Sequence, residues 1–122
     1  MTQNSEKIWQ VSEINRIVRE LLEQSFYPFW IEGELSNFKV HRSGHVYMTL
    51  KDNKSQVSAV FFRGADKVRS LGLEEGAKVE VLGRLTVYEP RGIYQLIVNR
   101  IRPKGKGDLQ RLFEERREKL RA

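Results

Sequence analysis

The chain has 122 residues, the length of one domain, and contains no cysteine. Disulfide frameworks, thiolate metal sites and cysteine nucleophiles are therefore excluded. Its 22 basic and 16 acidic side chains give a net charge of +6. The positive excess lies in residues 28–101 and, more densely, in residues 102–122. A basic domain followed by a more basic tail favours a polyanionic partner.

No stretch of the sequence predicts a membrane anchor or an export signal. No apolar run approaches the roughly 18 residues that a membrane span needs. Residues 1–10 are polar and lack the apolar core of a signal peptide. Together with the absence of cysteine, this predicts a cytoplasmic protein that is not bound to a membrane.

Residues 1–27 are predicted to form an N-terminal helical extension. Apolar residues recur at the spacing of one helix face: Ile14, Ile17, Val18, Leu21 and Leu22. Ser12 is the expected N-cap, and Pro28 marks the end of the helix. We expect the helix to lie across one end or side of the following domain and to bury this apolar stripe.

Residues 28–103 contain five predicted strands and one short helix. The strands are expected over residues 29–38, 45–51, 56–63, 78–88 and 93–101, and the helix over residues 65–71. A single helix between the third and fourth strands of a small all-β domain is typical of the OB-fold, a five-stranded barrel. The predicted fold class is therefore mainly β, an OB-fold barrel preceded by the N-terminal helix and followed by the start of another.

The alternation of side chains along the predicted strands assigns some faces of the barrel and leaves others open. Mid-strand Gly33 predicts a bulge or a sharp coil of the first strand. Alternation assigns Val46, Met48 and Leu50 to the core. Phe61 and Phe62 point to opposite faces, and the sequence leaves open which of them is buried. The faces of the fifth strand also stay open, because residues 96–98 are all apolar.

Residues 104–122 are predicted to form a glycine-containing linker and the start of a second helix. Gly105 and Gly107 interrupt the chain, and Asp108 is the expected N-cap. An apolar stripe follows without a C-cap, which indicates that the chain is part of a longer protein.

No catalytic constellation stands out in the sequence. His41 and His45 lie on a loop and a strand start, where a spacing of four does not bring two ligands together. Glu32 and Glu34 share one strand face, which is better explained by solvation or ion pairs than by a catalytic carboxylate pair. No phosphate-binding loop or dinucleotide fingerprint is present. We predict no catalytic residue, no metal site and no cofactor in this chain.

Aromatic and basic side chains gather at the loops and strand ends of the predicted barrel. Single-stranded nucleic acid needs flat apolar surfaces for its bases and cations for its phosphates. The predicted nucleic-acid-binding residues are Phe38, Arg42, His45, Tyr47, Lys51, Arg63, Tyr88 and Arg91. Tyr47 is the strongest of them, because its two neighbours point inward. Arg42 and Arg91 lie in the loops that flank the binding face of an OB-fold.

Several blocks of sequence carry a resemblance to a known family. They are residues 11–15 (VSEIN), 33–38 (GELSNF), 43–52 (SGHVYMTLKD), 88–92 (YEPRG) and 105–107 (GKG). From about Trp9 to Leu120 the chain resembles the N-terminal part of the large subunit of bacterial exodeoxyribonuclease VII.

This resemblance implies a function for the longer protein. The family hydrolyses single-stranded DNA from both ends to oligonucleotides, as a cytoplasmic complex of a large subunit with several copies of a small one. Its OB-fold is taken to bind the DNA strand. Its catalytic region lies downstream of the segment that matches here, so no catalytic residue is carried over, and contact with the small subunit belongs to that missing region.

Two other functions stay open at this point. One is an RNA-binding OB module, like the anticodon-binding domains of some aminoacyl-tRNA synthetases. The other is a structural docking domain for partner subunits, whose positive charge is incidental. Neither the strand pattern nor the charge distinguishes DNA from RNA, because that distinction often depends on the 2′-OH.

Overall fold

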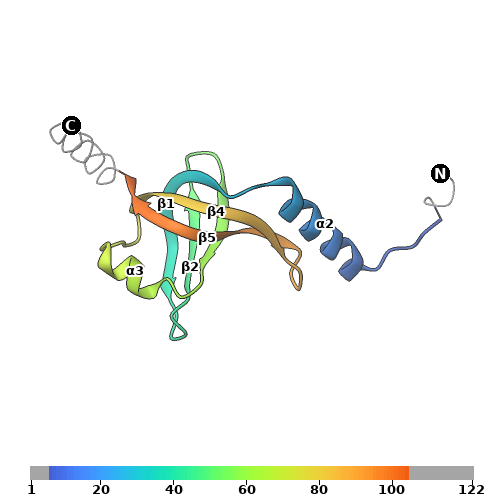
Figure 1. Ribbon diagram of the computed structural model, residues 1–122, viewed down its shortest axis with the longest axis horizontal. Helices are drawn as coiled ribbons and strands as arrows, with labels where there is room; N and C mark the ends of the chain where they lie inside the picture. Colours follow the sequence, from blue (N-terminus) through green and yellow to red (C-terminus); the bar gives the residue numbers. More distant parts are fainter. Residues whose placement is uncertain (1–5, 105–122) are drawn as a thin grey trace, which may run out of the picture.

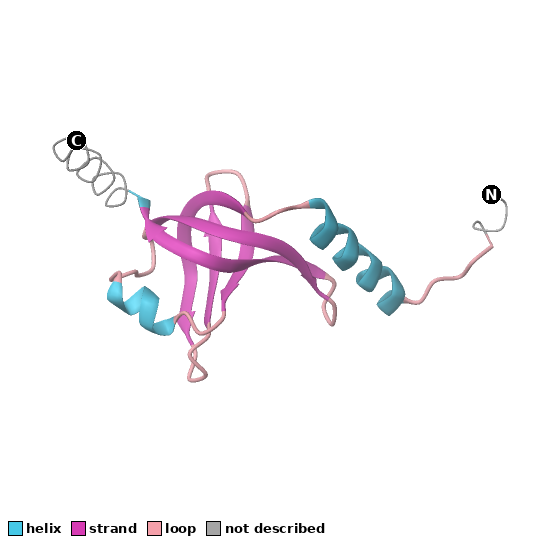
Figure 2. Cartoon of the chain, in the orientation of Figure 1, coloured by secondary structure: helices cyan, strands magenta, loops and turns pink. Residues whose placement is uncertain are grey.

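The computed structural model describes residues 6–104, which form a barrel with a helix at one side (Figure 1). The elements are α2 (Val11–Ser25), β1 (Phe29–Val40), β2 (Val46–Lys51), β3 (Gln56–Phe61), α3 (Ala65–Ser70), β4 (Lys78–Tyr88) and β5 (Ile93–Pro103). The barrel is closed in the order β1-β2-β3-β5-β4, with α3 between β3 and β4 (Figure 2). The predicted OB-fold is confirmed. The linker and helix predicted beyond Lys104 lie outside the described residues.

Strand β1 closes the barrel by pairing with two neighbours in turn. Residues 29–34 pair with β4, and the strand then pairs with β2 from Glu34 onward. A Cβ on Gly33 would lie 3.2 Å from the carbonyl oxygen of Lys51, so the close approach at this crossing favours glycine. The irregularity in the ladder lies further along, between Ser36 and Lys39, where Asn37 adopts a positive φ of 50°.

The core follows the predicted alternation of β2. Val46, Met48 and Leu50 are each no more than 3% exposed. The structure also distinguishes the two adjacent phenylalanines, because Phe61 packs against the core whereas Phe62 is 51% exposed. Strand β3 ends at Phe61 rather than at Arg63. The main chain turns there, and Arg63 has a positive φ of 56° that no strand accommodates.

Strand β5 pairs regularly with β4 over the ambiguous run 96–98, and the pairing shifts just after it. Leu82 pairs with Arg100 but Gly83 pairs with Val98, so one residue of β5 is left without a partner. Leu96 and Val98 belong to the core cluster. Ile97 is buried too, but it pairs with Val60 of β3, which lies outside that cluster. All three residues are therefore buried although they do not share a face.

Helix α2 differs from the sequence prediction at its start and in its packing. Its N-cap is Gln10, which forms a capping box with Glu13, so the assignment of Ser12 is wrong. None of its residues is buried, and Ile14, Val18 and Leu21 are 41–57% exposed. The predicted burial of the apolar stripe is also wrong, because only Ile17 and Leu22 of the stripe are half-buried. The helix lies beside the β4–β5 hairpin (Figure 1), and its hydrogen bonds to the hairpin come from polar side chains.

Within residues 6–104, no helix combines the length and the apolar character needed to cross a membrane.

Candidate nucleic-acid interface

A cleft of about 300 Å³ lies between β2, β3 and the β4–β5 hairpin. It brings together three of the predicted residues, Tyr47, Tyr88 and Arg91. We call it the Tyr47 cleft. Its polar lining comes from the side chains of Asn37, Thr49, Ser58 and Gln95. Aromatic rings, a cation and neutral hydrogen-bonding groups thus share one concave surface, as binding of single-stranded nucleic acid requires.

The two tyrosines of the cleft present accessible rings. Tyr47 is 45% exposed and Tyr88 is 49% exposed. Tyr47 sits in the middle of the sheet, paired with Lys39 on β1 and Val60 on β3. The His41 ring meets the Tyr47 ring edge-on, with 5.9 Å between centroids. A ring placed on a sheet and braced from one side is suited to stacking on a base, because little rotamer freedom remains to be lost on binding.

The turn that carries Arg91 is fixed by main-chain contacts. The main-chain N–H of Arg91 donates to the carbonyl of Tyr88 at 3.2 Å, and Gly92 adopts the positive φ of 62° that the turn requires. Asn15 of α2 donates from its amide to the Glu89 carbonyl at 2.9 Å. Arg91 itself is exposed, so its guanidinium is available to a phosphate at the rim of the cleft.

A second group of predicted residues lies at the start of β2. The Nδ1 atom of His45 accepts a hydrogen bond from the main-chain N–H of Arg63 at 3.0 Å. The His45 ring also meets Phe62 edge-on at 5.2 Å. His45 therefore braces the end of β3, and Arg63 and Phe62 are exposed beside it. Arg42 is exposed in the β1–β2 loop.

The remaining two predicted residues, Phe38 and Lys51, belong neither to the Tyr47 cleft nor to the group at the start of β2. Phe38 is partly buried and packs against the core, so less of its side chain is accessible than those of Tyr47 and Tyr88. Its main-chain N–H donates to the Glu75 carboxylate at 2.9 Å. Lys51 lies at the far end of β2, where its Nζ is 3.6 Å from the Glu34 carboxylate.

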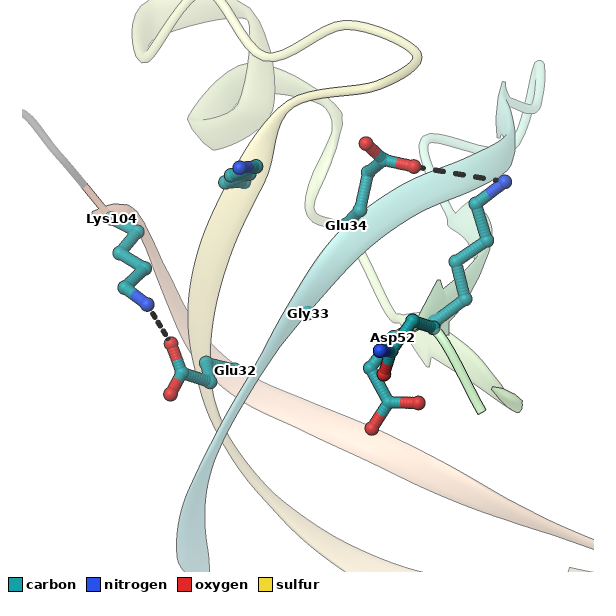
Figure 3. Close-up of a pocket in the computed structure, with 8 residues that line it drawn as sticks. Glu32, Gly33, Glu34, Asp52 and Lys104 are labelled. Atoms are coloured by element: carbon teal, nitrogen blue, oxygen red, sulfur yellow. Dashed lines mark ion pairs between the residues drawn. The ribbon is translucent and has the colours of Figure 1, made fainter. Parts of the chain in front are cut away.

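Another cavity, of about 530 Å³, lies beside β1 and is lined by Lys51 and seven other residues (Figure 3). Glu34 pairs with Lys51, and Glu32 pairs with Lys104. The hydrogen bond from Lys104 to Glu32 raises the pKa of the lysine above its ordinary value. These pairs confirm the interpretation of the two glutamates as ion-pair partners. Three lysines face three carboxylates here, so the cavity offers no net attraction to a polyanion.

Sequence reasoning missed Trp30 as a candidate. Its ring is 42% exposed on the outer surface of β1, with the guanidinium of Arg102 4.0 Å and that of Arg100 5.9 Å from the ring centroid. The two arginines come from β5, two strands away across the barrel wall. Strand alternation alone could have placed Trp30 outward, but the arginines become its neighbours only through the strand order.

Curated relatives match almost the whole chain. The exodeoxyribonuclease 7 large subunit of Pseudoalteromonas atlantica is 45% identical over 107 residues, which cover 88% of this chain and 24% of the relative. The protein of the same name from Vibrio parahaemolyticus is 43% identical over 122 residues, which cover 100% of this chain and 28% of the relative. The chain thus spans about a quarter of the length of these relatives.

Solved structures share the fold at low sequence identity. A replication protein A heterotrimer bound to single-stranded DNA matches with a TM-score of 0.52 and 15% identity, covering 64% of this chain and 57% of the other. The asparaginyl-tRNA synthetase of Entamoeba histolytica matches with a TM-score of 0.53 and 15% identity, covering 61% of this chain and 20% of the synthetase. At this identity the likeness extends to the fold alone.

The match to a protein family covers the helix and the whole barrel. Residues 9–102 match the family described as an OB-fold nucleic acid binding domain. This range includes α2, all five strands except the last residue of β5, and every residue of the Tyr47 cleft. The chain belongs to the family of OB-fold nucleic acid binding domains.

Proposed function

We propose that this chain is the single-stranded-DNA-binding module of an exodeoxyribonuclease VII large subunit. The observation that carries the proposal is the Tyr47 cleft, where two exposed tyrosines and Arg91 converge on one concave surface. Similarity to large subunits over nearly the whole chain supports the choice of DNA over other polyanions.

The cleft suggests how a single strand is held. Unpaired bases stack on the rings of Tyr47 and Tyr88, and stacking of this kind contributes about 1–3 kcal/mol per base without sequence preference. Arg91 pairs with a phosphate at the rim, and Arg42 and Arg63 extend the positive charge along the start of β2. In duplex DNA the bases are paired and stacked on one another, so duplex should compete poorly.

The rest of the proposed activity belongs to a longer protein. Residues 28–103 bind the strand, residues 1–27 form a helical extension, and residues 104–122 lead toward a catalytic region. Phosphodiester hydrolysis and contact with the small subunit are assigned to that region, because this chain spans about a quarter of its relatives. We also propose a cytoplasmic location, which the resemblance implies.

The experiment is a fluorescence-anisotropy titration with a labelled single-stranded oligonucleotide of about 15 nucleotides, near the upper site size of an OB-fold. The Tyr47→Ala/Arg91→Ala double variant should bind several-fold more weakly than the unsubstituted chain. A matched control, Tyr27→Ala/Arg69→Ala, removes one tyrosine and one arginine that are exposed outside the cleft. Equal affinities of the two double variants would refute the assignment of the cleft.

Competition separates the alternatives. An RNA oligonucleotide of the same sequence that displaces the DNA at lower concentration would favour an RNA-binding module. If the chain binds neither oligonucleotide at low salt, a docking domain is favoured. Light scattering then tests whether the chain associates with itself.

A further inference from the structure

The outer surface of β1, β4 and β5 carries a second aromatic and basic site, apart from the Tyr47 cleft. We propose that Trp30, Arg100 and Arg102 form a second contact for the same single strand, reached by nucleotides that leave the cleft. We call these three residues the Trp30 platform. The proposal rests on the proposed function, because it requires that the barrel bind single-stranded nucleic acid.

Two side chains of the platform, Trp30 and Arg102, are held against each other. The guanidinium of Arg102 lies 4.0 Å from the centroid of the Trp30 ring, a cation–π contact. The Nε of Arg102 donates to the Glu80 carboxylate at 2.7 Å, which fixes the guanidinium plane. Trp30 remains 42% exposed despite these contacts. A held indole and guanidinium are both surfaces on which a base stacks.

Arg100 supplies a cation for a phosphate. It lies 5.9 Å from the Trp30 centroid and forms no ion pair with another of the described residues. By contrast, Arg102 is engaged by Glu80. Outside the cavity beside β1, the charged side chains of β4 and β5 are three arginines, Arg84, Arg100 and Arg102, and one glutamate, Glu80. With three arginines against one glutamate, this part of the surface is positive, whereas the charges that line the cavity beside β1 are balanced.

Strand β5 connects the platform to the Tyr47 cleft. Ile93 and Gln95 line the cleft near one end of β5, and Arg100 and Arg102 lie toward the other end. At about 3.3 Å per residue, Gln95 and Arg102 are separated by about 23 Å along the strand. A span of this size fits the roughly 4–16 nucleotides that one OB-fold covers. Helix α2 contacts β4 at Arg84 and Thr86. Both residues lie closer to the β4–β5 hairpin than Leu82, the residue of β4 that pairs with Trp30.

Tryptophan fluorescence tests the proposal directly, because the chain has two tryptophans. In a Trp9→Phe background, Trp30 is the single reporter. An oligonucleotide of about 16 nucleotides should quench its emission, whereas one of about five, long enough only for the cleft, should bind without quenching. Replacement of Trp30 itself is avoided, since loss of the ring could disturb the sheet.

A charge variant provides the second measurement. Arg100→Ala should weaken binding of the long oligonucleotide about three- to ten-fold and leave the short one unchanged. It should also reduce the slope of log affinity against log salt by about 0.7, the loss of one phosphate contact on a single strand. Arg69→Ala on α3, an exposed arginine outside both sites, is the matched control.

The outcomes separate this inference from the proposed function. Binding of the long oligonucleotide with unchanged Trp30 emission, and with equal affinity for Arg100→Ala and Arg69→Ala, would overturn the platform while leaving the cleft intact. If anisotropy detects binding of neither oligonucleotide, both proposals are wrong.

Discussion

The guanidinium of Arg19 in α2 pairs with the carboxylate of Glu89 at the tip of the β4–β5 hairpin. Asn15, one helical turn earlier, donates to the carbonyl of the same glutamate at 2.9 Å. One turn after Arg19, Glu23 accepts a hydrogen bond from the Thr86 hydroxyl at 2.7 Å. A polar row of α2 therefore holds the hairpin that carries Tyr88 and Arg91, so the helix positions part of the cleft without lining it.

Loss of the ion pair between Arg19 and Glu89 should weaken DNA binding indirectly. Arg19→Ala should reduce affinity for a single-stranded oligonucleotide about three-fold, because a hairpin that is less ordered must be fixed on binding. Arg16→Ala removes the same charge from the same helix but only an exposed pair with Glu20. Anisotropy titrations compare the two variants. Equal losses in both would mean that charge, rather than positioning of the hairpin, explains the effect.

The exposed stripe of α2 should tolerate a charge. Leu21→Lys should change the free energy of unfolding by no more than about 0.5 kcal/mol, since Leu21 is 57% exposed. Leu96→Ala is the contrasting variant in the core, where complete burial predicts a loss of about 2–5 kcal/mol. Urea denaturation measures both. A large loss for Leu21→Lys would indicate that the stripe packs against the barrel after all.

Glycine should be required at position 83 for steric reasons. A Cβ there would lie 2.7 Å from the carbonyl oxygen of Ile97 and 3.0 Å from side-chain atoms of Leu96. Because the carbonyl belongs to the neighbouring strand, it moves only at the expense of the ladder, and Gly83→Ala should cost about 1–3 kcal/mol. At Gly33 the nearest atoms are at 3.2 Å, so Gly33→Ala should cost less in the same denaturation experiment. The reverse order would contradict this steric account.

Stability should depend on pH through Glu75. Its carboxylate accepts hydrogen bonds from the main-chain N–H groups of Phe38 and Asn37, and these lower its pKa below the ordinary value of 4.5. A lowered folded-state pKa stabilises the fold above the unfolded-state value, and this contribution is lost as the pH falls through the folded-state value.

The measurement compares urea denaturation of the unsubstituted chain and Glu75→Ala at several pH values. The stability difference should be largest near neutral pH and should shrink as the pH is lowered below 4.5. Glu74→Ala removes a neighbouring carboxylate that accepts no hydrogen bond from β1 among the described residues. A difference for Glu75→Ala that is independent of pH would show that its carboxylate charge is not what matters.

Most of the barrel could be predicted from sequence, because the alternation of apolar and polar residues within a strand indicates which of its faces is buried. Period-two alternation identified the buried side of β2, and the bounds of β4 agree at both ends. The errors arise where the structure depends on a neighbour. In β5, Ile97 is buried beside Val60 on the face opposite Leu96 and Val98, which hides the alternation, and a positive φ at Arg63 shortens β3.

The candidate site was predicted less completely, for a similar reason. Tyr47 could be assigned outward from Val46 and Met48 alone. Phe38 could not be distinguished from an exposed aromatic, because unbroken alternation from buried Leu35 assigns it outward, and the irregularity after Ser36 turns it toward the core instead. Trp30 was overlooked because its cationic neighbours belong to β5, and only the order of strands around the barrel brings them together.

The pairing of β1 with a strand on each side also limits how a ligand can bind to the barrel. Since β1 pairs with both β2 and β4, and β3 pairs with β5, the wall that residues 29–103 form has no open edge strand. Addition of a peptide, or of an unfolded copy of the chain, as an outer strand of this sheet is therefore disfavoured. Recognition is left to side chains on the wall and at the hairpin tips. Substitutions there can change what the domain binds without creating a new site of β-aggregation.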